Sequence, residues 1–335
     1  MEISSLLDAL FNLRYNICVC VFTESEITTQ YENCTIVVGF NDGATITEDV
    51  IKINLHTCRP DEITQQEHIP TTAVSQAVAA VYCNTMYVVG IGVEYDEIWK
   101  YNQTSGWTQC ASLVQGRRRH SAAFINEVLY ICGGFVYSTK VILDSVEAFN
   151  AVTHQCVTVG KLVHGVQMAG NCVPFKNSLY IFGGADKDNK SVSHVQVYNT
   201  VENTCTLLSK SMPRRYGLMR AILWETSVIL IGRYTCTCLI FNIESETWQE
   251  REQFKTDVGH FGLVLESGRL FVIGGGNRER DGDGNDVWKC INDIRYVPLQ
   301  SVLHNNKRIE WKIQGKLPKP SLVHTCANMR FLPGK

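Results

Sequence analysis

The chain has no long apolar run and almost no net charge. In its 335 residues, no apolar run approaches the length of roughly 20 residues that a membrane-spanning helix needs. The formal net charge is −2 at pH 7, so broad electrostatic attraction to nucleic acid or anionic membrane is not expected. The amino terminus lacks a basic flank followed by a clean apolar core, which argues against a secretory signal. We therefore expect a cytoplasmic protein that binds neither nucleic acid nor membrane.

Motifs that carry catalysis or hold a metal are also missing. No Gly-x-Ser-x-Gly, phosphate-binding loop or paired-carboxylate motif stands out. The Cys-x-Cys pairs at 18–20 and 236–238 have a shorter spacing than the common zinc sites. The acidic segment 281–286 begins like a calcium loop but lacks the glycine and glutamate that such a loop requires, so we expect a solvated loop. The sequence predicts no cofactor, no metal and no enzymatic activity.

Disulfides are not expected despite 14 cysteines. Most of the cysteines sit inside apolar runs, where a free thiol behaves as a small hydrophobic side chain. With 45% hydrophobic and 19% charged residues, the composition is that of a well-packed globule. We expect buried, reduced thiols in an intracellular protein.

Four short apolar runs lie between residues 118 and 160: HSAAFI, VLYIC, SVEAFN and QCVTVG. Each has the length and the β-branched or aromatic content of a strand, and turn residues separate each from the next. Four strands with hairpin spacing predict one antiparallel sheet. Because such a sheet cannot cover both of its faces, it must be stacked on copies of itself.

The copies are visible as a repeated glycine mark. LYICGG at Leu129–Gly134 recurs as LYIFGG at Leu179–Gly184 and as LFVIGG at Leu270–Gly275, with weaker echoes elsewhere. The period of roughly 45 to 50 residues is typical of kelch arrays. An aromatic residue and then a Trp or Cys follow most marks, at 101/107, 149/156, 198/205 and 241/248. On these motifs the chain resembles the kelch-repeat β-propellers, and most of all the propeller of the BTB–Kelch adaptor proteins.

The resemblance implies an all-β, six-bladed kelch propeller of four-stranded antiparallel blades. We expect a leader at 1–30, in which Met1–Asn16 have the spacing of a short amphipathic helix, and the propeller at 31–330. The approximate blades are 31–68 with 322–330, 75–112, 118–160, 167–212, 217–254 and 259–316.

The ring needs a strand that completes its first blade. His324–Met329 resembles the opening strand of a blade, yet the chain stops before completing another one. We expect this tail to close the ring and so to remove exposed sheet edges. The competing candidate is the strand-like run Tyr15–Phe22.

The resemblance also implies a function in protein recognition, as the substrate-recognition subunit of a cullin-3-type ubiquitin ligase. In that family a BTB domain contacts the cullin, and the 30-residue leader is too short to hold one. Two alternatives stay open: an actin-associated kelch scaffold, and a kelch-like sugar-modifying enzyme, for which fold analogy alone is a weak warrant.

Basic and aromatic residues in the loops between strands are the candidate partner-binding residues. One group precedes the third blade, one precedes the fifth, and one tyrosine follows a glycine mark. Arginine and tyrosine are favoured where a surface binds a partner, and arginine pairs with carboxylates through two parallel hydrogen bonds. We predict an acidic or phosphorylated protein ligand lying across blades 3 to 5; the alternative is a solvated charged rim. The predicted residues are Arg117, Arg118, Arg119, Tyr137, Arg214, Arg215 and Tyr216.

Overall fold

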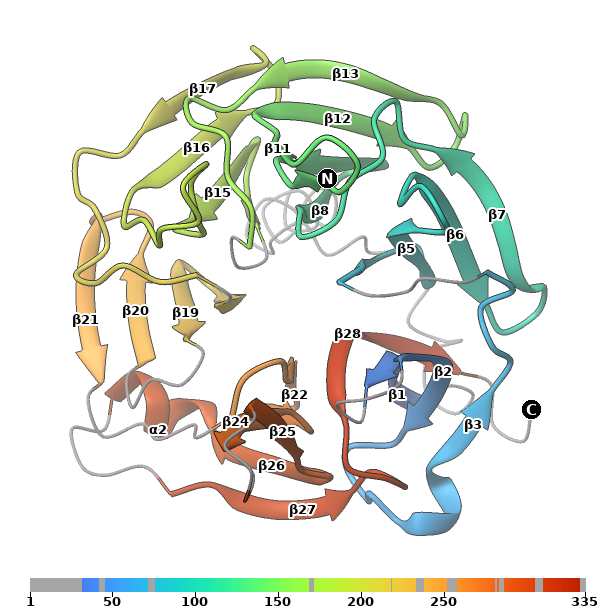
Figure 1. The fold of residues 1–335 in the computed structure, drawn as a ribbon. Helices are drawn as coiled ribbons and strands as arrows, with labels where there is room; N and C mark the ends of the chain where they lie inside the picture. The colour runs from blue at the N-terminus through green and yellow to red at the C-terminus, as the bar shows by residue number, and fades with distance from the viewer. Residues whose placement is uncertain are drawn as a thin grey trace, which may run out of the picture.

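The computed structural model is a ring of six antiparallel four-stranded sheets, arranged as blades about a central axis (Figure 1). It describes residues 32–41, 46–71, 76–168, 172–217, 219–232, 238–251, 258–280, 282, 286–304 and 310–331. The six-bladed all-β prediction is confirmed. The predicted leader and the alternative closing run at 15–22 lie outside the described residues.

Each blade runs from an inner strand near the axis to an outer strand at the rim. From inside to outside, blades 1 to 3 consist of β28 (Leu322–Phe331), β1 (Glu32–Asn41), β2 (Ile46–Ile53) and β3 (Thr64–Gln66); β4 (Val78–Tyr82), β5 (Thr85–Ile91), β6 (Glu97–Asn102) and β7 (Gly106–Ser112); and β8 (Ser121–Ile125), β9 (Val128–Cys132), β12 (Ser145–Asn150) and β13 (Cys156–Lys161). Blades 4 to 6 consist of β14 (Val173–Phe175), β15 (Ser178–Phe182), β16 (Val195–Asn199) and β17 (Thr204–Leu207); β18 (Arg220–Trp224), β19 (Ser227–Ile231), β20 (Cys238–Asn242) and β21 (Thr247–Arg251); and β22 (Gly262–Glu266), β23 (Arg269–Ile273), β26 (Asp293–Pro298) and β27 (Lys312–Lys316).

The second strand of a blade is buried on both faces, because each blade is stacked between two others. Six of the seven residues of β5 are buried, as are four of the five residues of both β19 and β23. Strands covered on both faces have near-continuous apolar sequences instead of alternating ones. This is why the apolar runs VVGI, VILI and LFVI stand out in the sequence.

The glycine pair after this strand docks one blade against the loop that enters the next blade. Gly133 and Gly134 have φ of 63° and 108°, which glycine adopts without a steric penalty. A Cβ on Gly133 would lie 2.4 Å from the carbonyl oxygen of Val166, and the Gly134 N–H donates to the same oxygen at 2.8 Å. The predicted need for positive φ and close approach is confirmed. Gly183–Gly184 and Gly274–Gly275 repeat this contact with the carbonyls of Tyr216 and Ser321.

The carboxyl-terminal strand closes the ring, as predicted. β28 and β1 pair antiparallel from Glu32↔Phe331 to Asn41↔Leu322, so strands from opposite ends of the chain form the inner half of blade 1. β28 also bonds to blade 2, where Ala79 N–H donates to Thr325 Oγ1 at 2.8 Å.

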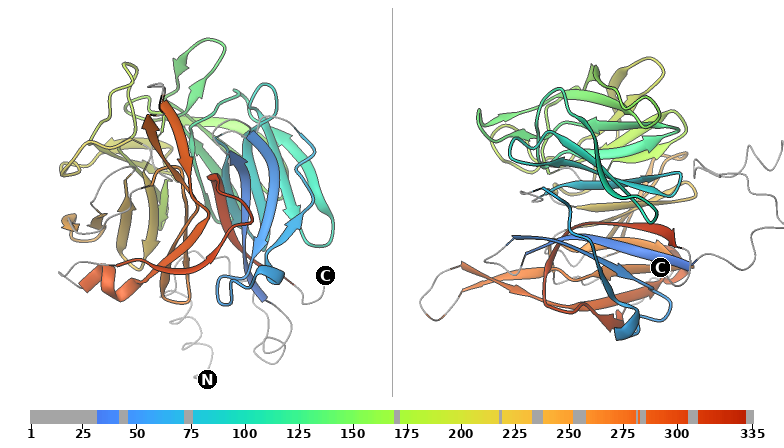
Figure 2. Two further views of the ribbon diagram at one scale, coloured as in Figure 1. Left: turned by 60° about the horizontal axis from the view of Figure 1, so that its bottom comes forward. Right: turned by 90° about the vertical axis from the view of Figure 1, so that its right-hand side faces the viewer.

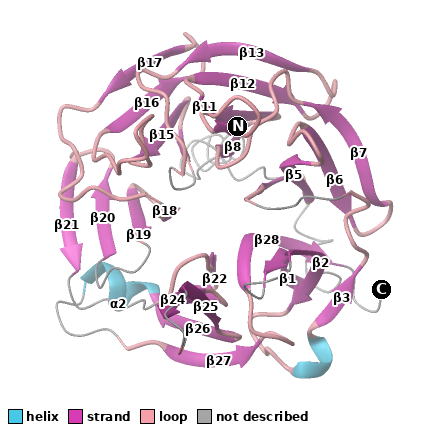
Figure 3. Cartoon of the chain, in the orientation of Figure 1, coloured by secondary structure: helices cyan, strands magenta, loops and turns pink. Residues whose placement is uncertain are grey.

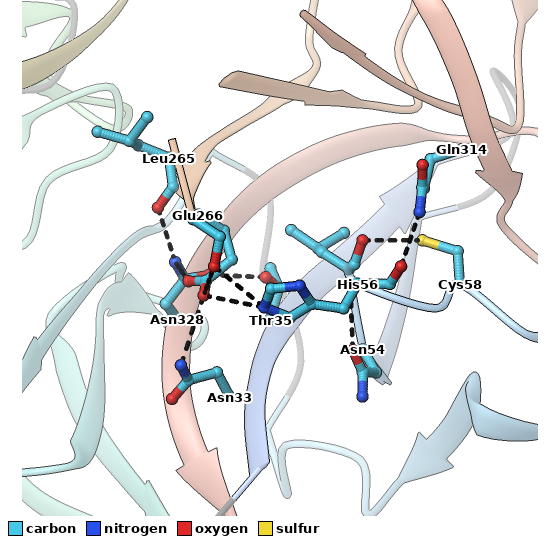
Figure 4. A network of polar contacts seen from close by, with 11 residues as sticks. Asn33, Thr35, Asn54, His56, Cys58, Leu265, Glu266, Gln314 and Asn328 are labelled. Carbon is cyan, nitrogen blue, oxygen red and sulfur yellow. Dashed lines mark hydrogen bonds and ion pairs between the residues drawn. The ribbon is translucent and has the colours of Figure 1, made fainter. Parts of the chain in front are cut away.

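A polar network joins blade 6 to blade 1 at the closing seam (Figure 4). The Asn328 side chain accepts from Thr35 Oγ1 at 2.6 Å and donates to the Leu265 carbonyl at 3.1 Å and to Glu266 Oε2 at 3.0 Å. At the outer end of the seam, Gln314 Nε2 donates to the His56 carbonyl at 2.8 Å. The tail therefore contributes polar contacts to two blades as well as a strand to its own.

Three additions interrupt the repeat (Figures 2 and 3). The hairpins β10 (Phe135–Val136) with β11 (Val141–Ile142), and β24 (Gly276–Arg280) with β25 (Asp286–Cys290), follow the second strands of blades 3 and 6. The acidic segment 281–286, expected to be a solvated loop, lies between the two arms of the second hairpin and mostly outside the described residues. The short helix α2 (Leu299–His304), also not predicted, buries Leu299 and Val302 against the interface of blades 5 and 6. Among the described residues, no helix is long and apolar enough to cross a bilayer.

Candidate functional site

Two kinds of loop gather at one end of the ring, which we call the loop end. They are the loops that follow the second strand of a blade and the loops that lead from an outer strand to the next inner strand. In an antiparallel sheet of four strands these connections lie at the same end, opposite the two hairpin turns. The glycine-pair contacts join the two kinds directly, and the hairpins β10–β11 and β24–β25 project from this end (Figure 2).

Arg117, predicted to bind a partner, is instead part of the core. Its side chain is fully buried and forms an ion pair with the equally buried Glu147 of β12. Arg117 Nη1 also donates to the Gly133 carbonyl at 3.0 Å and to the Ser145 carbonyl at 3.2 Å. A partner cannot reach this guanidinium, so the prediction for Arg117 was wrong.

The pair fixes the inter-blade loop to blade 3. Glu147 accepts backbone N–H bonds from Val114 at 2.8 Å and Gln115 at 3.1 Å, and Arg117 Nε donates to the Gln115 carbonyl at 3.1 Å. Burial lowers the pKa of Arg117, and the Glu147 carboxylate opposes that shift. Blade 4 uses a neutral version: Gln196 exchanges two hydrogen bonds with the backbone of His164. The ion pair of Arg117 and Glu147 thus has a structural role in blade 3.

Arg118 lies at the loop end among three aromatic rings. Its guanidinium carbon is 4.3 Å from the ring centroid of Tyr137, 5.6 Å from that of Tyr95 and 5.7 Å from that of Phe135. Lys140 Nζ lies 3.7 Å from the Tyr137 centroid. Cations over ring faces are attracted by the ring quadrupole. We call Tyr95, Arg118, Phe135, Tyr137 and Lys140 the cation–aromatic cluster.

The cluster combines a fixed guanidinium with free hydrogen-bonding capacity. Within the described residues, the Arg118 side chain makes no ion pair and no hydrogen bond, and Tyr137 is 52% exposed. Arginine presents planar donors that match carboxylate and phosphate groups, and stacking on aromatic rings holds it in place. This arrangement can bind an anionic group with aromatic contacts beside it.

Arg119 is half-buried and held by two amides. Its Nε donates to Gln76 Oε1 at 2.7 Å and its Nη1 to Gln167 Oε1 at 3.2 Å. Burial, and to a lesser extent the neighbouring Arg118, lowers its pKa. Arg119, whose guanidinium carbon lies 5.8 Å from the Phe135 ring centroid, therefore adds positive charge beside the cluster, with part of its hydrogen-bonding capacity already used.

The second predicted group occupies a different part of its loop. The Tyr216 carbonyl contacts Gly183 as the Arg117 carbonyl contacts Gly90, so Tyr216 corresponds to Arg117 in the repeat. Arg214 and Arg215 come earlier in the loop, and the predicted equivalence of the two arginine groups is off by about two residues. Arg214 pairs with Glu250 of β21, Arg215 is exposed, and the half-buried Tyr216 packs on the core of blades 4 and 5.

Three members of the cluster, Tyr95, Phe135 and Lys140, were not among the predicted residues. Tyr95 lies in the loop after the second strand of blade 2, at φ of 56°, and Lys140 closes the turn of the β10–β11 hairpin at φ of 60°. The sequence signal for these residues was their position, because both loops follow a strand that ends in a glycine mark. The sequence does not reveal that the two loops turn toward the same arginine.

A serine–histidine contact at the other end of the ring lacks catalytic geometry. Ser267 Oγ lies 3.1 Å from His56 Nε2, and Glu266 Oε1 approaches that same nitrogen at 3.6 Å. In a catalytic triad the acid holds the opposite ring nitrogen. His56 and Glu266 belong to the seam network described above (Figure 4).

A family model described as the kelch motif matches residues 116–162 and 171–212, which cover blades 3 and 4 and the arginine loop. Blades 3 and 4 of the six-bladed propeller are thus similar to kelch repeats. This propeller is 24% identical to mouse Kelch-like protein 35 over 62% of its length and 36% of the relative's, and 24% identical to human Kelch-like protein 23 over 69% and 39%. It is 23% identical to rat Kelch-like protein 24 over 91% of its length and 46% of the relative's.

The fold agrees with a solved structure titled "Structure of YjhT". The TM-score is 0.62 at 14% identity, over 75% of this chain and 86% of that one. The chain spans less than half the length of the curated relatives just named. The whole-protein activities of those relatives are therefore no guide to it by themselves.

Proposed function

We propose that this kelch propeller is a non-catalytic protein-interaction module, spanning 31–330, that recognises an acidic or phosphorylated segment at its loop end. The observation that carries the proposal is the unpaired guanidinium of Arg118 among the rings of Tyr95, Phe135 and Tyr137. Because Arg117 is buried, Arg118 would bind the anionic group, which would then lie at the seam of blades 2 and 3. Arg215 and Tyr216 would contact the rest of the ligand farther round the loop end.

The resemblance to BTB–Kelch propellers supports a cytoplasmic role as the substrate-recognition part of a cullin-3-type ubiquitin ligase. The propeller would supply the substrate contact, and a BTB domain would supply the cullin contact. Proximity labelling in cells separates this role from that of an actin-associated scaffold: we expect ligase components, and a neighbourhood of cytoskeletal proteins alone would contradict it.

Binding itself is tested with an array of acidic and phosphoserine peptides and titration of those captured. Arg118→Glu should abolish capture, because it places a carboxylate beside the anionic group. Arg118→Lys should weaken it about tenfold, because a lysine keeps the charge but loses the planar pair of donors. Tyr137→Ala should also weaken capture, because it removes the ring that holds the guanidinium.

The matched control is Arg59→Glu, at a residue whose side chain is 68% exposed in the loop between the third and fourth strands of blade 1, at the opposite end of the ring. It makes the same change of charge and should leave capture unchanged. Equal loss in both variants would indicate a non-specific charge effect. Unchanged capture by Arg118→Glu, at unchanged thermal stability, would refute the site.

A further inference from the structure

The outer strand of each blade is an open sheet edge, and five of the six edges carry a feature that discourages pairing. Strands β7, β13 and β27 have a register shift against their neighbour, which distorts the edge, and β13 and β27 also carry lysines. Strand β21 contains Glu250 and Arg251. Strand β3 has three residues and lies between Glu62 and Glu67. Bulges, charges and short length are the usual protections of edge strands.

Strand β17 of blade 4, with four residues, carries neither a charge nor a register shift. Its sequence is Thr204-Cys205-Thr206-Leu207, without a charge, and its register against β16 is regular from Gln196↔Leu207 to Asn199↔Thr204. Thr204, Thr206 and Leu207 are exposed. This is the edge of the ring best suited to accept another strand.

The free backbone groups of this edge follow from its register. The Leu208 N–H donates to the Val195 carbonyl at 3.0 Å, so residues 208, 206 and 204 direct their backbone groups toward β16. Cys205 and Leu207 direct theirs outward. They offer two N–H donors and two carbonyl acceptors along an exposed edge.

The flanking charges make the edge complementary to itself. Glu202 lies four residues before Thr206 and Lys210 four residues after it, and both are exposed. If two copies pair antiparallel about Thr206, Cys205 of each faces Leu207 of the other, and both have outward backbone groups. The same register brings Glu202 of each copy to the end that carries Lys210 of the other. We propose that β17 pairs with β17 of a second copy of this chain, giving a twofold-symmetric dimer.

The surroundings of β17 suit burial in such an interface. Exposed apolar side chains occur on β17 itself, at Leu207, and on the outer parts of blades 3 and 4, at Val152, Val157, Val163 and Val201, of which Val152 and Val201 are 71% and 70% exposed. A strand pair of this length is small, and a stable interface buries about 1,000 Å² or more. The valines extend the contact beyond the strand, and in a twofold dimer each is used twice.

Sedimentation velocity of the full chain at rising concentration tests the dimer. Thr206→Lys should raise the dissociation constant about tenfold or more, because two lysines would then face each other on the symmetry axis. Thr108→Lys, at an exposed threonine of β7, is the matched control and should leave it unchanged. A chain that stays monomeric up to about 1 mM, where even a weak interface associates, would overturn the proposal. A dimer unaffected by Thr206→Lys, or equally weakened by Thr108→Lys, would overturn it as well.

The antiparallel register has its own test. Glu202→Lys and Lys210→Glu should each weaken the dimer about fivefold, as expected for exposed ion pairs made twice, and the double exchange should restore it. Hydrogen exchange at the Cys205 and Leu207 amides should slow as the protein concentration rises. Failure of the double exchange to restore the dimer, or exchange independent of concentration, would overturn the proposed pairing.

Discussion

Replacing Arg117 by methionine should destabilise the propeller more than replacing an exposed loop arginine. Removing one partner of a buried ion pair leaves the other charge without compensation, which costs about 3–5 kcal/mol. The change also leaves the carbonyls of Gly133 and Ser145 without this donor. With an unfolding entropy of about 2.1 cal/mol/K per residue, this loss lowers the melting temperature by about 4–7 °C. Differential scanning calorimetry measures the shift, and Arg215→Met is the control that should leave it unchanged.

A second substitution at Glu147 separates lost charge balance from lost packing. Glu147→Gln added to Arg117→Met removes the uncompensated charge and keeps an acceptor for the Val114 and Gln115 amides, as Gln196 provides one in blade 4. We expect the double variant to recover at least half of the lost stability. If Arg117→Met instead leaves melting unchanged and abolishes peptide capture, Arg117 is a surface contact and the core assignment is refuted.

Two further predictions concern the closing strand and pH. Deletion from Leu322 onward should give an unfolded or insoluble chain in expression and melting assays. The four buried side chains of this strand, Leu322, Val323, Met329 and Phe331, contribute about 6–12 kcal/mol, which is comparable to the stability of a whole domain. A soluble truncation with unchanged melting would show that another segment closes the ring. Burial, aided by the charge of Arg117, lowers the pKa of His120 to about 3, so the folded state binds a proton less readily than the unfolded chain, whose histidine titrates near 6.5. The stabilisation from this pKa difference is complete above pH 6.5 and is lost as the pH falls toward 3, with about 2 kcal/mol lost by pH 5. The melting temperature of His120→Phe should therefore depend less on acid pH than that of the unsubstituted protein. The same pH dependence in both proteins would contradict the burial of a neutral histidine.

The fold was predictable because its two requirements leave local marks. A strand buried on both faces must be apolar throughout, and the approach of the next loop requires glycine, so LYICGG and its copies carry both signals. The closing strand was predictable because its sequence resembles an opening strand. Helix α2 was not, because it lies in an insertion that occurs in one blade and has no copies for comparison. The arms of the β24–β25 hairpin were not either, because their sequences do not resemble those of the β10–β11 hairpin in blade 3.

The site was only partly predictable, because an arginine side chain can be buried or exposed according to its partner. Arg117 lies thirty residues from Glu147, and the sequence alone does not join them. A signal was nevertheless present: SVEAFN places a glutamate within an apolar strand, and VQVYN places a glutamine at the same repeat position. A charge in a strand buried on both faces needs a buried partner, and the loop that enters the same blade offers three arginines.

The corrected alignment of the two arginine loops also changes what the loop end can recognise. Successive residues of an extended chain direct their side chains to opposite sides, so adjacent arginines take different roles: Arg117 enters the core and Arg118 faces the rings at the loop end. The positions equivalent to Arg118 are Gln167 in blade 4 and Gly259 in blade 6, as their pairing with the loop after each glycine mark indicates. A fixed guanidinium is thus present at the seam of blades 2 and 3 and is not repeated at those two. Recognition should therefore depend on one anionic residue bound beside Tyr137, so Arg118→Glu should weaken capture of a partner segment far more than Arg215→Glu.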